Sequence, residues 1–267
     1  MSLSAGRKTI FITGAGSGIG RATARLFAQR GWFCGLYDVN EQGLAETASM
    51  LGPQTSTSGV FDVTDRQGWS DAVSAFGDAT GGRMHVLFNN AGIGRHGPFE
   101  QIPEEDSRRI VDINLNGVIH GIYAALPLLE KTPGSRIVNT ASTAGVIGSP
   151  KLAVYSATKF AVRGLSEALD VEFAPKGIRV TCLTPWFIET PILDMGSHEG
   201  ANARMSDEIR AGGMDVYPVE MAAERAWDAA HGDAVVYPVG KAAERARFMS
   251  RFFPGLIRKQ LLKGAAR

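Results

Sequence analysis

Short runs of apolar and β-branched residues alternate along this chain with longer stretches in which apolar residues recur at helical spacing. The short runs predict seven strands, at Thr9–Thr13, Phe33–Tyr37, Thr57–Phe61, Met84–Phe88, Arg136–Thr140, Val180–Thr184 and Ala234–Tyr237. The stretches between them predict helices at Arg21–Arg30, Asn40–Leu51, Gln67–Ala79, Glu104–Leu129, Val154–Phe173 and Val219–His231. Alternation of strand and helix requires parallel pairing through right-handed crossovers, with helices on both faces of one sheet. The sequence therefore predicts a doubly wound α/β fold.

We expect a single domain over residues 1–240, in which one segment breaks the alternation. Residues 189–216 combine four glycines with Met195, Met205 and Met214 among polar residues. That mixture predicts either a mobile lid over an apolar site or an ordinary surface loop.

Residues 241–267 are predicted to form a basic C-terminal tail. Eight Lys or Arg residues accompany a single acid, Glu244, so the tail carries a formal charge of +7 and the rest of the chain about −6, within a total of +1. Six apolar residues of the tail could share one helix face, namely Phe248, Phe252, Leu256, Ile257, Leu261 and Leu262. Such a helix could make weak contact with an anionic membrane surface. We favour the alternative, in which it docks on its own domain or on a neighbouring subunit.

Composition and net charge further limit the classes of protein that fit this sequence. With 267 residues, 44% of them hydrophobic and 21% charged, the chain suits one large globular domain. Its net charge of +1 gives no overall field to attract nucleic acid, so no nucleic-acid partner is expected. Cys34 and Cys182 lie in apolar strands and are expected to be buried free thiols. Because residues 1–8 lack the apolar run of a signal peptide and no segment is long enough to span a bilayer, we expect a cytoplasmic protein.

A glycine-rich turn follows directly on the first predicted strand and opens the first helix. It reads Thr-Gly-Ala-Gly-Ser-Gly-Ile-Gly over residues 13–20. Its glycines allow the backbone to approach a pyrophosphate, which the first-turn amides and the positive end of the helix dipole attract. The spacing is Gly-x-x-x-Gly-x-Gly and differs from the Gly-x-Gly-x-x-Gly of long-chain dehydrogenases. We expect cofactor contacts from Gly14, Gly16, Ser17, Gly18, Ile19 and Gly20.

Asp38 ends the second predicted strand, 18 residues after Gly20. A carboxylate there can accept hydrogen bonds from the adenosine ribose, and it would repel the 2′-phosphate of NADP. Two like charges ~4 Å apart cost about 4 kcal/mol at an effective dielectric of 20. Neither Ser17 nor Val39, the two positions expected to compensate, is basic. The sequence therefore favours NAD, with NADP as the alternative.

Further motifs follow in order: Asn-Asn-Ala-Gly at residues 89–92, Asn114 in a predicted helix, Ser142 after the fifth strand, and Tyr155-Ser-Ala-Thr-Lys159. Together with the glycine turn, they make the chain resemble the classical, NAD-preferring subgroup of the short-chain dehydrogenase/reductase (SDR) family over about residues 9–237. The resemblance implies a Rossmann-type parallel sheet with strand order 3-2-1-4-5-6-7. It also implies a homodimer or homotetramer formed through the two longest predicted helices.

Tyr155 and Lys159 lie one helical turn apart, so both face the same way. A free phenol has a pKa of ~10, and lowering it by 2–3 units requires roughly 3–4 kcal/mol of phenolate stabilisation. A lysine ammonium several ångströms away supplies energy of that order. We therefore expect Lys159 to lower the pKa of Tyr155 and make it a proton-transfer group.

The family resemblance assigns roles to these residues. Tyr155 would act as general acid/base on the substrate oxygen, Lys159 would also hold the nicotinamide ribose, and Ser142 would stabilise charge on that oxygen. Thr143 rivals Ser142, but the thirteen-residue spacing to Tyr155 favours Ser142. Asn114 matches the family position that supports Lys159 through a water-linked proton path.

The same resemblance extends the cofactor site beyond the glycine turn. It implies contacts from Asp62, Val63, Asn90, Ala91, Gly92, Tyr155, Lys159, Pro185, Ile188 and Thr190. Trp186 departs from the family pattern, which has glycine after this proline, and is expected beside the nicotinamide end and the substrate. No metal is expected, because the five histidines show no metal-ligand spacing.

These features predict an NAD-dependent oxidoreductase that transfers a hydride between nicotinamide and a secondary alcohol or ketone of apolar character. The alternatives are an NADP-dependent carbonyl reductase and a non-catalytic dinucleotide sensor, although a sensor need not keep Ser142, Tyr155 and Lys159 together. A sugar epimerase shares similar catalytic residues but needs a further C-terminal domain, for which 267 residues leave little room.

Overall fold

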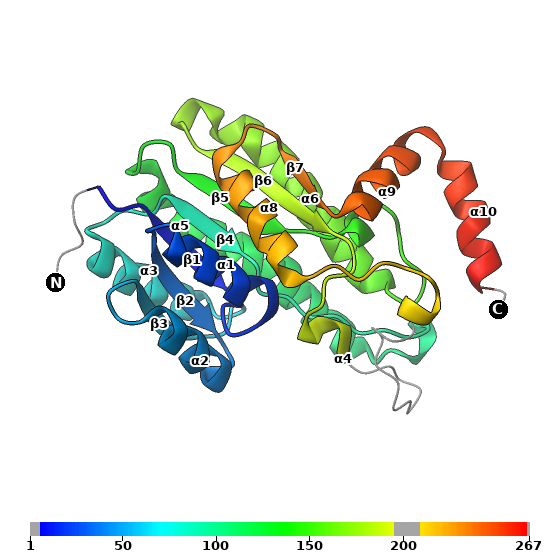
Figure 1. The fold of residues 1–267 in the computed structure, drawn as a ribbon, viewed down its shortest axis with the longest axis horizontal. Coiled ribbons are helices and arrows are strands. Elements are labelled where there is room, and N and C mark those ends of the chain that lie inside the picture. The colour runs from blue at the N-terminus through cyan, green and yellow to red at the C-terminus, as the bar shows by residue number, and fades with distance from the viewer. Residues whose placement is uncertain (1–5, 195–208, 266–267) are drawn as a thin grey trace.

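A seven-stranded parallel sheet forms the centre of the protein in the computed structural model, which describes residues 6–194 and 209–265 (Figure 1). The strand order is β3-β2-β1-β4-β5-β6-β7, so the predicted Rossmann-type topology is confirmed. The strands are β1 (Thr9–Thr13), β2 (Phe33–Asp38), β3 (Ser56–Val60), β4 (Val86–Asn89), β5 (Arg136–Thr140), β6 (Arg179–Pro185) and β7 (Val236–Val239). In this order β1 pairs with both β2 and β4, so the topology switches direction at the carboxyl end of β1. Ligands of open α/β sheets bind at such switch points.

Helices cover both faces of the sheet, as predicted. They are α1 (Gly18–Gln29), α2 (Glu41–Leu51), α3 (Arg66–Thr80), α4 (Glu104–Val111), α5 (Gly117–Glu130), α6 (Ala153–Phe173) and α8 (Val219–His231). Buried side chains of α3, α5 and α6 form a hydrophobic core on one face, and those of α1, α2 and α8 form a second core on the other. Along β1, Phe11 enters the first core, while Ile10 and Ile12 enter the second. This alternation follows from the two-residue period of a strand.

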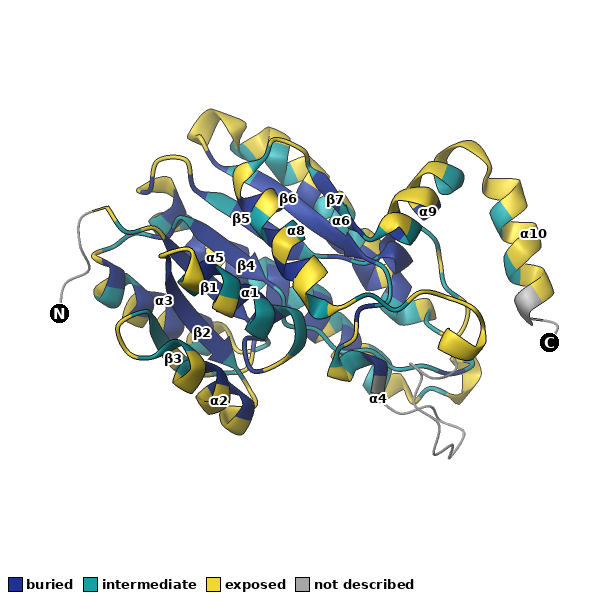
Figure 2. Cartoon of the chain, in the orientation of Figure 1, coloured by how far each residue is buried: buried dark blue, intermediate teal, exposed yellow. Residues whose placement is uncertain are grey.

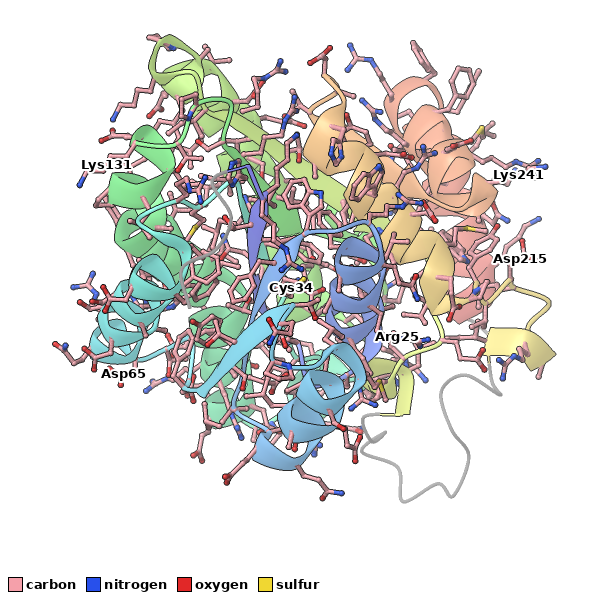
Figure 3. All side chains as sticks on the ribbon, turned by 60° about the vertical axis from the view of Figure 1, so that its left-hand side comes forward. Arg25, Cys34, Asp65, Lys131, Asp215 and Lys241 are labelled. Atoms are coloured by element: carbon pink, nitrogen blue, oxygen red, sulfur yellow. The ribbon has the colours of Figure 1, made fainter. Side chains whose placement is uncertain are left out.

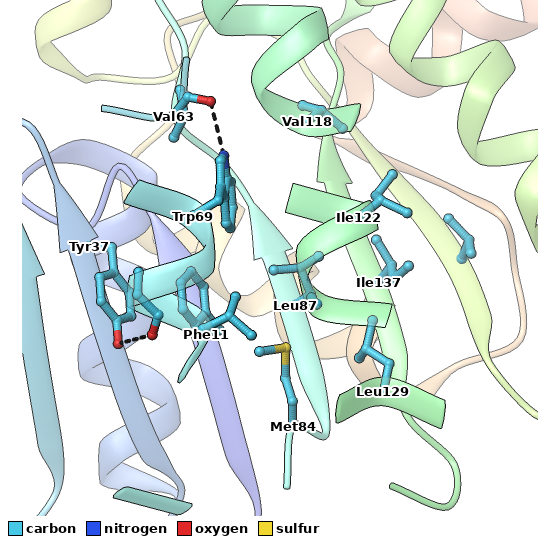
Figure 4. Close-up of a cluster of buried hydrophobic side chains, with 14 of the residues drawn as sticks. Phe11, Tyr37, Val63, Trp69, Met84, Leu87, Val118, Ile122, Leu129 and Ile137 are labelled. Carbon is cyan, nitrogen blue, oxygen red and sulfur yellow. Dashed lines mark hydrogen bonds between the residues drawn. The ribbon is translucent and has the colours of Figure 1, made fainter. Parts of the chain in front are cut away.

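Aromatic side chains cluster in one part of the first core, beside many aliphatic ones (Figure 4). Phe11 stacks on Tyr37 with ring centroids 4.1 Å apart, and Trp69 packs against its other side at 5.6 Å. The polar atoms of these rings are satisfied, because Nε1 of Trp69 donates to the Val63 carbonyl at 2.9 Å and the Tyr37 hydroxyl donates to the Ala72 carbonyl at 3.2 Å. Burying a large apolar side chain stabilises a fold by roughly 1.5–3 kcal/mol. This core therefore anchors α3 to the strands that carry the glycine turn.

The long helix predicted at Glu104–Leu129 is present, but it contains a π-helical turn that the sequence did not predict. The stretch Glu104–Leu129 forms α4 and α5 with a π-helical turn, Asp112–Asn116, between them. The wider turn places the buried Asn114 where its amide donates to the Ile93 carbonyl and its oxygen accepts from the Ile93 amide, both at 2.9 Å. Apolar periodicity does not reveal such a turn, because the side-chain pattern on either side stays helical. π-bulges inside helices occur frequently at functional sites.

The basic tail forms two helices rather than one, α9 (Lys241–Phe252) and α10 (Pro254–Ala265), so its six apolar residues do not share a single helix face. The break follows from Pro254, which lacks an amide proton and starts a new helix. Helix α9 packs against β7, where Ala243 and Ala246 are buried, whereas α10 contacts α9. Within the described residues, no helix is long and apolar enough to cross a membrane.

The predicted lid, residues 189–216, is described only at its two ends. Residues 195–208, which include Met195 and Met205, lie outside the described residues. At the first end, Pro191–Asp194 forms a 3₁₀ turn, and at the second, Ile209 is buried. Tyr217, just beyond the second end, forms a β-bridge with Ile188.

Candidate active site

The glycine turn lies at the carboxyl end of β1, beside the loop that follows β4. Gly14 and Gly18 adopt positive φ angles of 66° and 49°, which side-chain-bearing residues rarely tolerate. A methyl group on Gly20 would lie 2.0 Å from the Gly14 carbonyl oxygen, so only glycine lets α1 start this close to β1. On Gly18 it would lie 3.0 Å from Cγ2 of Thr190. The turn therefore contacts the segment after β6.

The amino end of α1 is open to an anion. Ser17 is the N-cap residue, yet its side chain makes no capping hydrogen bond, and the first turn of α1 contains no acidic residue. Uncapped amides at a helix start concentrate partial positive charge. The turn thus has the features of a phosphate cradle, with Gly14, Gly16, Gly18, Ile19 and Gly20 supplying its backbone.

Asp38 closes this cradle at the end of β2. Its carboxylate accepts hydrogen bonds from the backbone amides of Gly16 at 2.8 Å and Asn40 at 2.9 Å. Arg21 lies on the other side of the Gly16 peptide, where its guanidinium donates to the Gly16 carbonyl at 2.5 Å and pairs with Glu46 at 2.8 Å. The same guanidinium donates to Thr47 and to the Gly43 carbonyl, which joins the turn to α2.

The predicted Asn-Asn-Ala-Gly turn joins the cradle to the catalytic residues. The amides of Asn90 and Ala91 donate to Oγ1 of Thr13 at 3.0 and 3.1 Å, and the Asn90 side chain donates to the Thr13 carbonyl. A methyl group on Gly92 would lie 3.2 Å from Oδ1 of Asn114 and 3.5 Å from Nζ of Lys159. Gly92 therefore leaves open the space beside those two side chains.

Asp62 and Val63, also expected in the cofactor site, follow β3. Asp62 is exposed, and its carboxylate accepts hydrogen bonds from the amide and hydroxyl of Thr64, each at 2.9 Å. Val63 is buried against Gly117, where an added methyl group would lie 2.8 Å from Cγ2 of Val63. Asp62 thus presents a fixed carboxylate at the carboxyl edge of the sheet, next to β2.

The four predicted catalytic residues gather at the carboxyl ends of β4 and β5. Nζ of Lys159 lies 5.5 Å from the ring centroid of Tyr155 and donates to the Thr140 carbonyl at 2.8 Å. The Ser142 hydroxyl lies close enough to the Tyr155 phenol to act on its pKa. Asn114 reaches the same helix through Thr158, whose Oγ1 lies 3.3 Å from its amide. The π-helical turn with Asn114, the loop after β5 with Ser142, and α6 with Tyr155 and Lys159 thus meet at one site.

We expected Lys159 to lower the pKa of Tyr155. In the structure of the protein alone, this expectation is wrong. Burial raises the pKa of the Tyr155 phenol above its ordinary value, and only the Ser142 hydroxyl acts in the opposite direction. Burial also lowers the pKa of Lys159 to about 8. The reason is desolvation, which disfavours the charged form of each group and here outweighs their attraction. The phenol is therefore protonated at neutral pH.

The structure separates the roles of Ser142 and Thr143. Thr143 is buried and donates to the Pro185 carbonyl at 2.9 Å, so its hydroxyl ties the 3₁₀ turn Thr143–Gly145 to the end of β6. Ser142 caps the same turn, with Oγ accepting from the Ala144 amide at 3.1 Å, and its hydroxyl meets Tyr155. Ser142, rather than Thr143, is therefore the hydroxyl that lies beside Tyr155.

Residues 185–190 run from the end of β6 along the cradle. Ile188 is buried in the second core, whereas the Thr190 hydroxyl donates to the Ile188 carbonyl at 3.1 Å and its methyl group lies beside Gly18. Trp186 is partly buried, its ring lies edge-on to Phe187 at 5.2 Å, and its Nε1 has no hydrogen-bond partner within the described residues. Its indole thus has a free donor near the site.

Several residues of this site were not predicted from the sequence. Thr13 organises the Asn-Asn-Ala-Gly turn through its hydroxyl, the Thr140 carbonyl holds Lys159, and Arg21 braces the glycine turn. Gly94 lies against Tyr155, with an added methyl group 3.7 Å from the ring. Thr13 and Arg21 flank the glycine motif, so their position in the sequence is a weak signal of their role. The role of the Thr140 carbonyl leaves no signal in the sequence, because every residue has a backbone carbonyl.

Gly145 sets the distance between Ser142 and the helix that carries Tyr155. A methyl group on Gly145 would lie 2.5 Å from the Lys159 carbonyl oxygen, so Gly145→Ala must push the 3₁₀ turn away from α6. We expect a loss of about 1–3 kcal/mol in the free energy of unfolding, together with a fall in kcat. Gly148→Ala is the matched control, because nothing lies within 4 Å of its added methyl group. Denaturant unfolding and turnover of both variants test this, and equal behaviour would contradict it.

Comparisons with known proteins agree with this geometry. A family model described as short chain dehydrogenase matches residues 8–200. Cyclohexanol dehydrogenase of Acinetobacter sp. strain SE19 is 38% identical over 197 residues, which cover 72% of this chain and 78% of that protein. A short chain dehydrogenase/reductase from Burkholderia phymatum, solved in complex with NAD, superposes with a TM-score of 0.82 at 27% identity over 95% of both chains. The 3-ketoacyl-(acyl-carrier-protein) reductase from Brucella melitensis, complexed with NADH, has a TM-score of 0.77 at 30% identity, covering 87% of this chain and 96% of that one.

The fold, the site and these matches define the class of the protein as an oxidoreductase that acts on CH–OH groups. Within that class, the chain belongs to the short-chain dehydrogenase family.

Proposed function

We propose that this protein is an NAD-dependent dehydrogenase that interconverts a secondary alcohol and its ketone. The observation that carries the proposal is the convergence of Ser142, Tyr155 and Lys159 beside the glycine cradle, at one edge of the sheet. A dinucleotide sensor would need the cradle alone, whereas this arrangement also provides a proton donor for a substrate oxygen.

The residues around the cradle fit a dinucleotide. The uncapped start of α1 suits its pyrophosphate, and the open space at Gly92 beside Lys159 suits its nicotinamide ribose. Asp38 at the end of β2 and Asp62 after β3 would hold the adenosine end, and Thr190 of the segment after β6 lies beside Gly18 of the cradle. When bound, the nicotinamide supplies the acceptor or donor of the hydride.

The side chains of the protein handle the proton and the substrate oxygen. Ser142 donates a hydrogen bond to that oxygen and stabilises the charge that develops on it. Because burial raises the pKa of Tyr155, its phenol holds a proton at neutral pH and can deliver it during carbonyl reduction. With a pKa of about 8, Lys159 is mostly an ammonium at pH 7, where its charge favours the phenolate that the transfer leaves behind. Asn114 fixes the loop and helix around this pair.

The choice of NAD rests on Asp38 and on the state of Arg21. The carboxylate of Asp38 lies against Gly16 at the end of β2, and the nearby Arg21 is already paired with Glu46. Arg21 therefore does not offset the repulsion between Asp38 and a 2′-phosphate. An NADP-dependent carbonyl reductase, the second candidate, would need such an offset.

The substitution Asp38→Asn tests this choice and the proposed function together. Asparagine keeps an acceptor for the Gly16 amide but removes the charge, so we expect the ratio of kcat/KM for NAD over NADP to fall by roughly 100-fold. Asp78→Asn, on the exposed face of α3, is the matched control and should leave the ratio unchanged. Turnover of cyclohexanol and other secondary alcohols with each cofactor, followed by absorbance of the reduced nicotinamide, provides the measurement. A wild-type enzyme that prefers NADP would overturn the assignment of NAD.

We also propose apolar substrates and a homodimer or homotetramer. Ile192 lies near the proposed substrate end of the site, since it reaches the same glycine, Gly94, that lies against Tyr155. Trp186 and Phe187, whose rings are in contact, precede it in the segment after β6. For assembly, α5 and α6 expose large apolar side chains, including Tyr123 and Val171. Burial of such residues between subunits would stabilise an oligomer.

A further inference from the structure

The two last helices carry an apolar surface that the body of the protein leaves uncovered (Figure 2). Phe248 and Phe252 lie one turn apart on α9 with ring centroids at 4.9 Å, and Phe253 joins them at 6.3 Å from Phe248. Leu256 and Leu262 continue the surface along α10. These five residues, called the tail surface below, are each between 45% and 58% exposed. A cluster of three exposed phenylalanines is unusual on a monomer and indicates an interaction site.

The charge around the tail surface has one sign. From residue 245 to residue 263 the chain contains six Lys or Arg residues and no Asp or Glu. All six basic side chains, at 245, 247, 251, 258, 259 and 263, are exposed. Glu244, which precedes this stretch, is paired with Arg225 of α8 at 3.2 Å. Within these nineteen residues, the tail surface is therefore accompanied only by positive charge.

This combination fits an anionic lipid surface better than a second copy of the chain. A second copy of the chain would bring the same positive charge against the tail surface, and like charges that face each other across an interface oppose binding. Helices that lie on membranes instead combine exposed aromatic and leucine side chains with basic residues that reach the phosphate groups. A charge of +6 within nineteen residues, interleaved with Phe and Leu, matches the second description.

The tail is held in a defined direction relative to the active site. Helix α9 is fixed to β7 by the buried Ala243 and Ala246, and the Ala242 amide donates to the Tyr217 hydroxyl at 3.2 Å. The Tyr217 ring lies against Gly240, and its backbone pairs with Phe187 and Glu189 of the segment after β6. In Figure 3, Lys241 at the start of α9 and Asp215 near Tyr217 lie on the same side of the molecule. Helix α10 extends away from the body beyond this anchor (Figure 1).

We propose that α9 and α10 dock the protein on anionic phospholipid surfaces, with the tail surface inserted among the lipids and the basic side chains on their phosphates. The docking is peripheral and reversible, because the apolar contribution is a few side chains and the rest is electrostatic. It is independent of the oxidoreductase chemistry, so it stands or fails separately from the proposed function.

Vesicle flotation of the full chain tests the docking. With vesicles of equal parts phosphatidylglycerol and phosphatidylcholine at low salt, the wild-type protein is expected to float, and with pure phosphatidylcholine or at high salt it is expected to stay behind. The triple substitution Arg258→Gln, Lys259→Gln, Lys263→Gln should lower the partition coefficient by roughly 100-fold. The double substitution Phe248→Ser, Phe252→Ser should lower it by roughly tenfold or more.

A charge-matched control separates the tail from the rest of the surface. Arg25, Arg66 and Lys131 are exposed basic residues of the body, and their joint substitution by glutamine removes the same charge. This control should float like the wild type, and circular dichroism should show all variants folded. The proposal is overturned if the wild type does not bind anionic vesicles, or if the control loses as much binding as the tail variant. It is also overturned if the tail variants change the molar mass by light scattering without any vesicle binding, since the partner is then a second copy.

Discussion

Replacing Tyr155 with phenylalanine is expected to lower kcat by about 10³-fold or more while dinucleotide binding is retained. The substitution removes the hydroxyl that meets Ser142 and leaves the ring in place beside Gly94. Phenylalanine has no hydroxyl group, so it cannot carry the proton that Tyr155 is proposed to transfer.

Steady-state kinetics and titration of the dinucleotide by its fluorescence measure the two effects separately. Tyr123→Phe, at an exposed position on α5, is the matched control and should keep wild-type turnover. Near-normal turnover of the Tyr155 variant would reject its role as acid/base. Loss of dinucleotide binding together with turnover would instead show a role in holding the site together.

Replacing Lys159 with methionine is expected to lower kcat/KM by roughly 100-fold. At 5.5 Å from the Tyr155 ring centroid, an ammonium stabilises a phenolate by about 3 kcal/mol at an effective dielectric of 20, which corresponds to that factor in rate. Methionine is an unbranched side chain one atom shorter than lysine that suits a buried position, but it cannot donate to the Thr140 carbonyl. The loss should fall on both kcat and dinucleotide affinity, because Lys159 also borders the open space at Gly92.

The pH profile gives this prediction a second readout. Burial lowers the pKa of Lys159 to about 8, so its charge is present below that pH and is lost above it, well before an ordinary lysine would lose its own. An inflection near pH 8 in the wild-type profile should be absent from the methionine variant. Lys131→Met, at an exposed position, is the control. An unchanged inflection in the Lys159 variant would assign it to another group.

Most of the architecture follows from local patterns. The strands β1 and β5 and the helix α8 have the predicted bounds, and other element ends differ by only a few residues, as where α1 begins at Gly18 rather than Arg21. Period-two and period-3.6 patterns identify elements well because burial of one face is a local property of the chain. Ends are less certain, since they depend on caps and on neighbouring turns. The π turn at Asn114 and the break at Pro254 were likewise not predicted from the apolar pattern.

The sequence alone determined the class of fold and predicted the members of the catalytic group. Each motif occupies a short stretch, so the glycine turn, Ser142 and the Tyr155–Lys159 pair could be recognised one by one. Only the tertiary structure decided how these residues act on one another. The pKa directions of Tyr155 and Lys159, the engagement of Arg21 by Glu46, and the exposure of the tail surface all depend on solvent exclusion and on contacts between distant segments. Desolvation and charge pairing act through space, and a linear pattern does not contain those distances.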